Sequence, residues 1–195
     1  MLSLSACNQE QSRTSASQTL ATIFEEYYQF KDRINPIEAT KGGNFQYNEY
    51  IANYISDAYQ TDLIAEYSTF LERLAQIDPA QLSQADLLSM KVMQWDCEVK
   101  LEGLQNPLVI TTSPIYNLPS FELTPLIQVQ SLHLYVAQLG AGGSVHPFNT
   151  VKDYEDWLKR LDDYIAFLDT SIANMMEGIA KGIVLPKVLT NLHNL

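Results

Sequence analysis

One uninterrupted apolar stripe near the C-terminal end constrains the fold of this chain more than any other feature. Apolar residues recur there at alternating steps of four and three, namely Tyr154, Leu158, Leu161, Ile165, Leu168, Ile172, Met175 and Ile179. This spacing predicts one face of a helix about 40 Å long, which begins at a capping pair formed by Thr150 and Asp153. Because so long a helix needs several partners to bury its stripe, shorter helices are expected to pack along it.

Shorter apolar patterns predict those partners. They indicate helices over residues 20–34, 50–59, 63–77, 83–103 and 126–139, and the fourth carries the stripe Leu88, Val92, Trp95 and Val99. Prolines stop any helix between residues 105 and 125, so that stretch is expected to be irregular and either to line a cleft or to cross the surface. The predicted fold is all-α, a bundle of five to six helices around one long central helix (151–180), with a Pro-rich irregular loop.

The composition argues against nucleic-acid binding and against a membrane-spanning helix. The chain has 195 residues, a formal net charge of −11 and a pI near 4.5, which argues against nucleic-acid binding because phosphates require clustered Lys and Arg. No run of 18 apolar residues occurs, so the sequence predicts no spanning helix. Cys97 lies in a helical pattern and is interpreted as a buried free thiol.

The first residues resemble the lipobox of bacterial lipoproteins. Leu4-Ser5-Ala6-Cys7 precedes a Ser/Thr/Gln-rich run, which is typical of a flexible tether, and the resemblance makes Cys7 the lipid attachment site. Only six residues precede Cys7, so we expect Met1 to lie inside a longer signal peptide; a fortuitous cysteine in a disordered leader is the alternative. The predicted organisation is a leader and tether over residues 1–19 and one helical domain over residues 20–195.

The chain lacks the sequence motifs of a catalytic centre. His133, His146 and His193 lack the H-E-x-x-H spacing of a zincin, and G-x-S-x-G does not occur. His133 is interpreted as structural, and the other two histidines as solvated. Glu122 has no acidic partner in the irregular stretch. The pairs Glu25-Glu26 and Asp162-Asp163 are interpreted as solvated faces, and Met175-Met176 as core. No catalytic or metal-binding residue is therefore expected in this chain.

Two segments resemble a known family. The first runs from Asn35-Pro36 through Ala39-Thr40 and Gly42 to Tyr47-Asn48. The second comprises Pro147, Phe148, Thr150, Asp153, Tyr154, Arg160, Leu161, Gly178, Ile179, Gly182 and Pro186. Both resemble signatures of the bacterial family called domain of unknown function 885 (DUF885), although Lys41 and the doubled glycine Gly42-Gly43 depart from its usual pattern. The signature residues are expected to have structural roles.

The resemblance implies a function that this chain carries only in part. Members of the family are longer and are grouped with zinc metallopeptidase-like proteins, whose metal motif lies in the C-terminal half. The chain is thus expected to be the N-terminal, non-catalytic portion of an envelope lipoprotein, inactive alone and anchored to the outer membrane facing the periplasm. Its partner would be the missing C-terminal half, which would supply zinc and the site for a peptide-like substrate. The rival hypothesis is a self-contained helical lipoprotein that serves as a binding or scaffold module.

Overall fold

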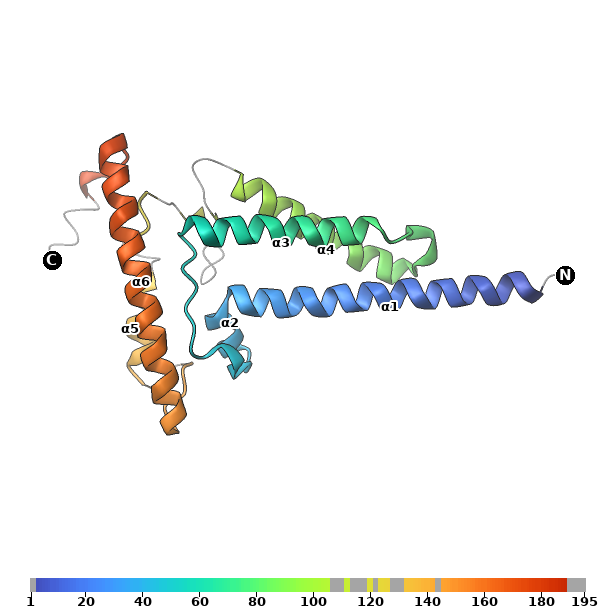
Figure 1. Ribbon diagram of the computed structural model, residues 1–195, viewed down its shortest axis with the longest axis horizontal. Coiled ribbons are helices and arrows are strands. Elements are labelled where there is room, and N and C mark those ends of the chain that lie inside the picture. The colour runs from blue at the N-terminus through green and yellow to red at the C-terminus, as the bar shows by residue number, and fades with distance from the viewer. Residues whose placement is uncertain are drawn as a thin grey trace. The chain divides into compact units, whose positions relative to one another are not determined.

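The all-α fold expected from the sequence is confirmed. The computed structural model describes residues 3–105, 111–112, 119–120, 123–126, 132–142 and 145–188. They form six α-helices, which are α1 (Ser3–Ile34), α2 (Pro36–Lys41), α3 (Asp57–Ala75), α4 (Gln84–Leu104), α5 (Leu132–Gly140) and α6 (Val151–Lys181) (Figure 1). Two short 3-10 helices cover Phe45–Tyr47 and Pro79–Gln81. Strand β1 (Thr111–Thr112) pairs antiparallel with β2 (Pro119–Ser120).

The chain divides into two compact units instead of one bundle around the long helix. The first unit comprises Met1–Lys31 and Asp62–Glu102, and the second comprises Asp32–Thr61 and Gly103–Leu195. The long helix α6 therefore belongs to the second unit alone. Within the described ranges, none of the helices combines the length and apolar character that crossing a bilayer requires.

The first unit is built from α1, α3 and α4. Phe30 of α1 stacks edge-on against Tyr67 of α3, with ring centroids 5.2 Å apart, and Tyr27 meets Phe70 in the same way at 5.1 Å. Such T-shaped pairs bring the positive edge of one ring to the negative face of the other. An ion pair between Arg73 and Glu26 joins the same two helices at the surface. Aromatic packing therefore holds α1 against α3.

Helix α4 turns a different face to the core than its apolar stripe suggests. The buried side chains are Met90, Met93 and Cys97, whereas Leu88 and Trp95 of the predicted stripe are 65% and 64% exposed. The stripe faces away from the core, because the flexible methionines and the thiol fill the core on the opposite side. The first unit consequently shows an apolar face to solvent.

Residues 8–19 are helical, although their composition suggested a flexible tether. They lie inside α1, and Ser17 Oγ donates a 2.9 Å hydrogen bond to Asp86 Oδ2 of α4. No Gly or Pro occurs between Ser3 and Ile34, so nothing in the sequence interrupts the helix. The N-terminal signature begins only after this helix, where Asn35 caps α2 with its side-chain oxygen 3.3 Å from Glu38 N. The short helix Pro36–Lys41 is not among the helices that the apolar patterns predicted.

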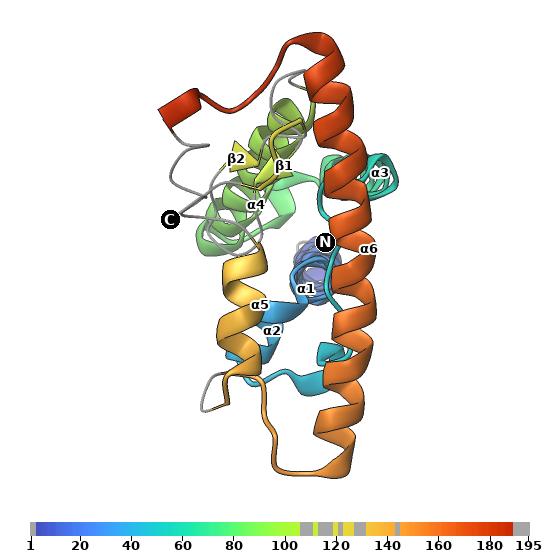
Figure 2. The ribbon, with the colours of Figure 1, turned by 90° about the vertical axis from the view of Figure 1, so that its left-hand side faces the viewer.

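The second unit pairs α5 with the antiparallel helix α6 (Figure 2). Residues 50–56 are not helical, so the predicted helix over 50–59 is wrong, and α3 begins only at Asp57. Instead, backbone groups of this stretch bond to side chains of α6: Ile51 N–H donates to Asp163 at 2.9 Å, and Ile55 O accepts from Asn174 at 3.1 Å. The core of the unit consists of Ile37, Ile51, Tyr54, Ile55, Leu132, Tyr135, Val136, Leu139 and Phe167.

The long helix itself buries a face that the sequence did not predict. Its buried residues are Asp156, Arg160, Phe167, Ser171 and Gly178. Leu161, Leu168 and Met175 of the predicted stripe are partly covered, but Leu158, Ile165 and Ile172 are 62%, 56% and 58% exposed. The shorter helices that were expected to bury this stripe therefore cover it only in part. Polar side chains face inward because they bond to the non-helical stretch beside α6.

Candidate functional site

The two signature segments meet at the buried guanidinium of Arg160, which is fully inaccessible to solvent. Its Nε donates to Tyr50 O at 3.2 Å, and its Nη2 donates to Thr40 Oγ1 at 2.6 Å and to Tyr47 O at 3.3 Å. A longer contact of 3.4 Å joins Nη2 to Pro36 O. The fork of Arg160 thereby ties α6 to α2 and to the residues that follow α2.

Thr40 connects this guanidinium to the N-terminal signature. Its Oγ1 accepts from Arg160, and the same hydroxyl donates toward Asn48 Oδ1 and Pro36 O, with O···O distances of 2.8 and 2.9 Å. Thr40 and Asn48 are both buried, so their polar atoms require these partners. Gly43 closes the turn between them with a φ of 87°, a conformation that favours glycine.

His146 completes the centre, and its tautomer follows from its partners. Its Nδ1 lies 2.9 Å from Arg160 Nη1, and its Nε2 lies 2.9 Å from Asp153 O. Since a guanidinium only donates, Nδ1 must accept, and Nε2 must carry the proton that is donated to the carbonyl. The expectation that His146 is solvated is wrong: the side chain is 1% exposed, and both ring nitrogens are used inside the protein.

Burial sets the protonation of both side chains. It lowers the pKa of Arg160 to about 10, and the negative charge of Asp156 opposes that shift. Burial also holds the pKa of His146 below its ordinary value, against the raising effect of the Asp153 carbonyl and with the help of the nearby Arg160 charge. The pair at neutral pH is thus a charged arginine and a neutral histidine. The carboxylate of Asp156 is itself held by Lys152, which contacts both oxygens at 2.7 and 2.8 Å.

The start of α6 is fixed by the capping pair that the sequence predicted. Thr150 Oγ1 accepts from Asp153 N at 3.2 Å, and the Asp153 carboxylate accepts from the Thr150 and Asn149 amides at 2.8 Å. This reciprocal capping box is confirmed. Phe148 lies over the same corner, with its ring 4.8 Å from His146 and 5.7 Å from Trp157. Aromatic rings therefore shield the arginine centre on the side of the cap.

The two signature glycines lie at the other end of α6. A Cβ on Gly178 would lie 2.7 Å from Ile183 O and 2.8 Å from Leu123 O, so only glycine permits this close backbone approach. Gly182 ends the helix with a left-handed φ of 72°. Gly182 therefore ends the helix, and Gly178 permits close backbone packing, so both signature glycines have structural roles.

The remaining candidate residues are scattered. Cys97 is a buried free thiol as predicted, and burial raises its pKa to about 11, which makes it unreactive. Asp163 bonds to Ile51 N, so its interpretation as solvated is wrong, whereas Met176 is exposed instead of lying in the core. Residues from the same predictions that lie outside the described ranges are Glu122 and His193. The other signature and candidate residues are placed as follows: Tyr154, Asp162 and Pro186 are exposed, and Pro147 and His133 are half-buried.

The arginine centre, which consists of Arg160, Thr40, Asn48 and His146, contains hydrogen-bonding groups but little that could take part in a reaction. Arg160, Thr40, Asn48 and His146 are all closed off from solvent and engaged with one another. Among the described residues, no three His, Cys, Asp or Glu side chains come together as metal ligands. The donor set in this part of the chain therefore does not fit the zinc that the family resemblance implies.

The fold and this centre define an all-α protein in which two separate sequence segments are joined by one buried arginine. The chain belongs to the family described as "Bacterial protein of unknown function (DUF885)", which matches residues 36–193. The match begins at Pro36, so it includes every group bonded to Arg160 and leaves out all of α1. Neither the curated proteins nor the solved structures gave a match.

Proposed function

We propose that this chain forms the N-terminal, non-catalytic helical portion of a larger DUF885 protein. In this proposal α6 forms one wall of a helical cleft, and the remainder of the protein covers the exposed stripe of α6 and contributes the catalytic groups. The implied chemistry is zinc-dependent hydrolysis of a peptide or amide bond. The residues of this chain would bind and orient that other half, without taking part in the bond cleavage.

The exposed stripe of α6 carries the proposal. It comprises Val151, Tyr154, Leu158, Ile165, Ile172, Met176 and Ile179, and it follows the helix over nearly its whole length. Contiguous apolar surface of this kind marks an interaction site, because folded proteins otherwise keep such patches small. The opposite side of the same helix is fixed through Arg160, Asp163 and Asn174. A rigid helix with a free apolar face is suited to act as a docking wall.

The cellular placement that accompanies this proposal rests on the N-terminal sequence. Leu4-Ser5-Ala6-Cys7 resembles a lipobox, so we propose lipid attachment at Cys7 and an outer-membrane-anchored protein that faces the periplasm. With the native upstream sequence present, the chain should incorporate labelled palmitate, and Cys7→Ser should abolish incorporation. Palmitate labelling that is unchanged by Cys7→Ser would remove this part of the proposal.

The docking role is tested with the sequence that follows Leu195 in the same reading frame. That sequence should contain an H-E-x-x-H-like motif, and its product should co-purify with this chain when the two are co-expressed. Replacing Ile165 and Ile172 by Gln should break the complex, while Glu155→Gln, on another exposed face of α6, should leave it intact. A stop codon with no downstream frame, or a complex insensitive to the Gln variants, would overturn the proposal in favour of a self-contained scaffold.

A further inference from the structure

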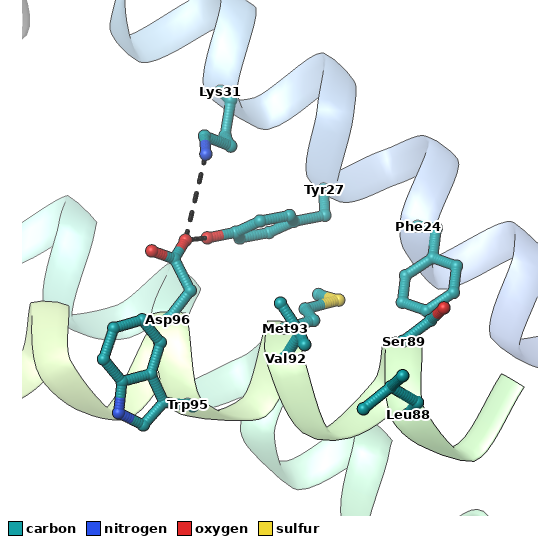
Figure 3. A pocket seen from close by; sticks show the side chains of 9 residues that line it. All are labelled: Phe24, Tyr27, Lys31, Leu88, Ser89, Val92, Met93, Trp95 and Asp96. Carbon is teal, nitrogen blue, oxygen red and sulfur yellow. Dashed lines mark hydrogen bonds and ion pairs between the residues drawn. The ribbon is translucent and has the colours of Figure 1, made fainter. Parts of the chain in front are cut away.

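The first unit contains an open groove that is separate from α6. It lies between α1 and α4, has a volume of about 670 Å³ and is lined by apolar side chains, among them Phe24, Leu88 and Val92 (Figure 3). One wall, α1, lies outside the residues that match the family. We propose that this groove binds an amphipathic helix whose apolar face is flanked by Lys or Arg.

The spacing of the α4 side chains indicates a helical occupant. Leu88, Val92, Trp95 and Val99 follow one another at steps of four, three and four, and all four are exposed. This is the spacing of a helix–helix seam, and it extends over about 16 Å of α4. Since the opposite face of α4 is already buried through Met90, Met93 and Cys97, the exposed face is a second packing surface on the same helix.

The architecture of the unit points to the same occupant. Aromatic pairs join α1 to α3, α4 adds Met90, Met93 and Cys97 to the core, and the seam between α1 and α4 is left open. A fourth helix laid into such a seam closes a four-helix bundle, in which every helix buries one apolar stripe. Binding of an amphipathic helix in a groove between helices is also a recurrent mode of peptide recognition.

The floor of the groove is preorganised at its polar end. Figure 3 shows Tyr27 and Lys31 reaching from α1 toward Asp96 on α4. The Tyr27 hydroxyl donates to Asp96 Oδ2, and Lys31 Nζ lies 3.8 Å from the same oxygen. These contacts hold the two walls together before any partner binds, so little ordering of the groove itself is needed.

The charge of the first unit favours a basic helix over a second copy of the chain as the occupant of the groove. Acidic residues outnumber basic ones roughly two to one in the first unit, and the whole chain carries a net charge of −11. Inside the groove, Lys31 and Asp96 pair with each other, and on the flank of the α4 stripe Glu98 and Glu102 outnumber Lys91. Two copies docked through this face would bring like charges together, whereas Lys or Arg beside the apolar stripe of a partner would meet this net negative flank. The occupant is therefore a basic amphipathic helix.

Two synthetic peptides test this inference on the full chain. Both carry Leu at heptad a and d positions; one has Lys and the other Glu at the flanking positions, and each bears a fluorescent label for anisotropy. The Lys peptide should bind, and the Glu peptide should bind at least about tenfold more weakly. Replacing Leu88 and Val92 by Gln should weaken the Lys peptide by about tenfold or more, because two apolar contacts are lost. These side chains are exposed, so the variants should keep the wild-type circular dichroism spectrum.

The matched control is Ile172→Gln, which removes an equally exposed apolar side chain from α6 in the second unit. It should leave peptide binding unchanged, so failure of the groove and failure of the α6 docking wall are distinguishable. Equal binding of both peptides, or equal loss in the Ile172→Gln control, would overturn the inference. Sedimentation that shows a dimer abolished by Val92→Gln would instead assign the groove to a second copy.

Discussion

Replacing Arg160 by Met tests whether the buried guanidinium holds the second unit together. Met fills a similar apolar volume but donates no hydrogen bond, so His146 Nδ1 and Tyr50 O lose their partners at 2.9 and 3.2 Å. Each buried acceptor left unsatisfied costs about 1–3 kcal/mol. Relief of the desolvated charge offsets part of this cost. We expect a net loss of about 3 kcal/mol, a large share of the roughly 5–15 kcal/mol available to a folded domain.

The assay must report on the second unit alone. The chain has two tryptophans, and Trp157 lies 5.3 Å from the His146 ring, whereas Trp95 belongs to the first unit. In a Trp95→Phe background, the fluorescence of Trp157 during urea unfolding therefore reports on the arginine centre. The stability of Arg160→Lys should lie between that of wild type and that of Arg160→Met, because the shorter lysine side chain donates to fewer of the acceptors. Glu155→Gln, on another exposed face of α6, is the control and should leave the unfolding midpoint unchanged.

A double variant checks the reasoning behind the magnitude. Arg160→Met with His146→Leu removes donor and acceptor together, so its loss of stability should be smaller than the sum of the two single losses. The hydrogen-bond account of the centre would be refuted if Arg160→Met lowered the free energy of unfolding by less than about 1 kcal/mol. Strictly additive single losses would refute the coupling between the two side chains.

Three further predictions concern the same unit. Phe167→Ala should cost about 3–5 kcal/mol in urea unfolding because the ring is fully buried, whereas Ile165→Gln, on the exposed face, should leave the midpoint near wild type; equal losses would contradict the observed face of α6. The stability supplied by His146 should be fully present above pH 6.5, its unfolded pKa, and should fall as the pH drops below that value, because only the unfolded chain takes up the proton there. His146→Gln should therefore show a smaller loss between pH 7.5 and pH 5.5 than wild type, and an unchanged loss would count against a lowered pKa. Gly178→Ala should cost about 1–3 kcal/mol because its Cβ would collide with the backbone oxygens of Leu123 and Ile183, a loss that Gly103→Ala, with open space around it, should not share.

Local features of the sequence predicted local features of the fold. The four-and-three spacing predicted α6 within one residue of its observed end, and the pair Thr150 and Asp153 predicted its capping box. Each of these depends on residues within one or two turns of one another, so the sequence contains the information directly. The predicted helix end at residue 34 is likewise followed by the cap Asn35, although the short helix α2 that begins at Pro36 was not predicted.

The arginine centre was predictable only in part. The resemblance named Arg160 and, in the other segment, Thr40 and Asn48, but nothing in the spacing showed that they meet. Two of the remaining acceptors are the carbonyls of Tyr47 and Tyr50, and every residue has a carbonyl, so no side-chain pattern could indicate them. His146 was interpreted as solvated because a proline follows it, whereas its burial depends on a contact fourteen residues away.

Helix α6 buries its polar face and exposes much of its apolar stripe. This has a physical cause that the spacing of hydrophobic residues does not reveal. Residues 50–56 are neither helix nor sheet, so the backbone groups of Tyr50, Ile51 and Ile55 need other partners once they are buried. Leaving one such group unsatisfied costs about 1–3 kcal/mol, comparable with the roughly 1.5–3 kcal/mol gained by burying one Leu or Ile side chain. Arg160, Asp163 and Asn174 satisfy these three groups from a single face of α6, and Phe167 fills the space between them. The polar face therefore binds within the unit, and the apolar face is left exposed. The partner that we propose for this face needs backbone bonds that are already satisfied, which is the condition that another helix meets.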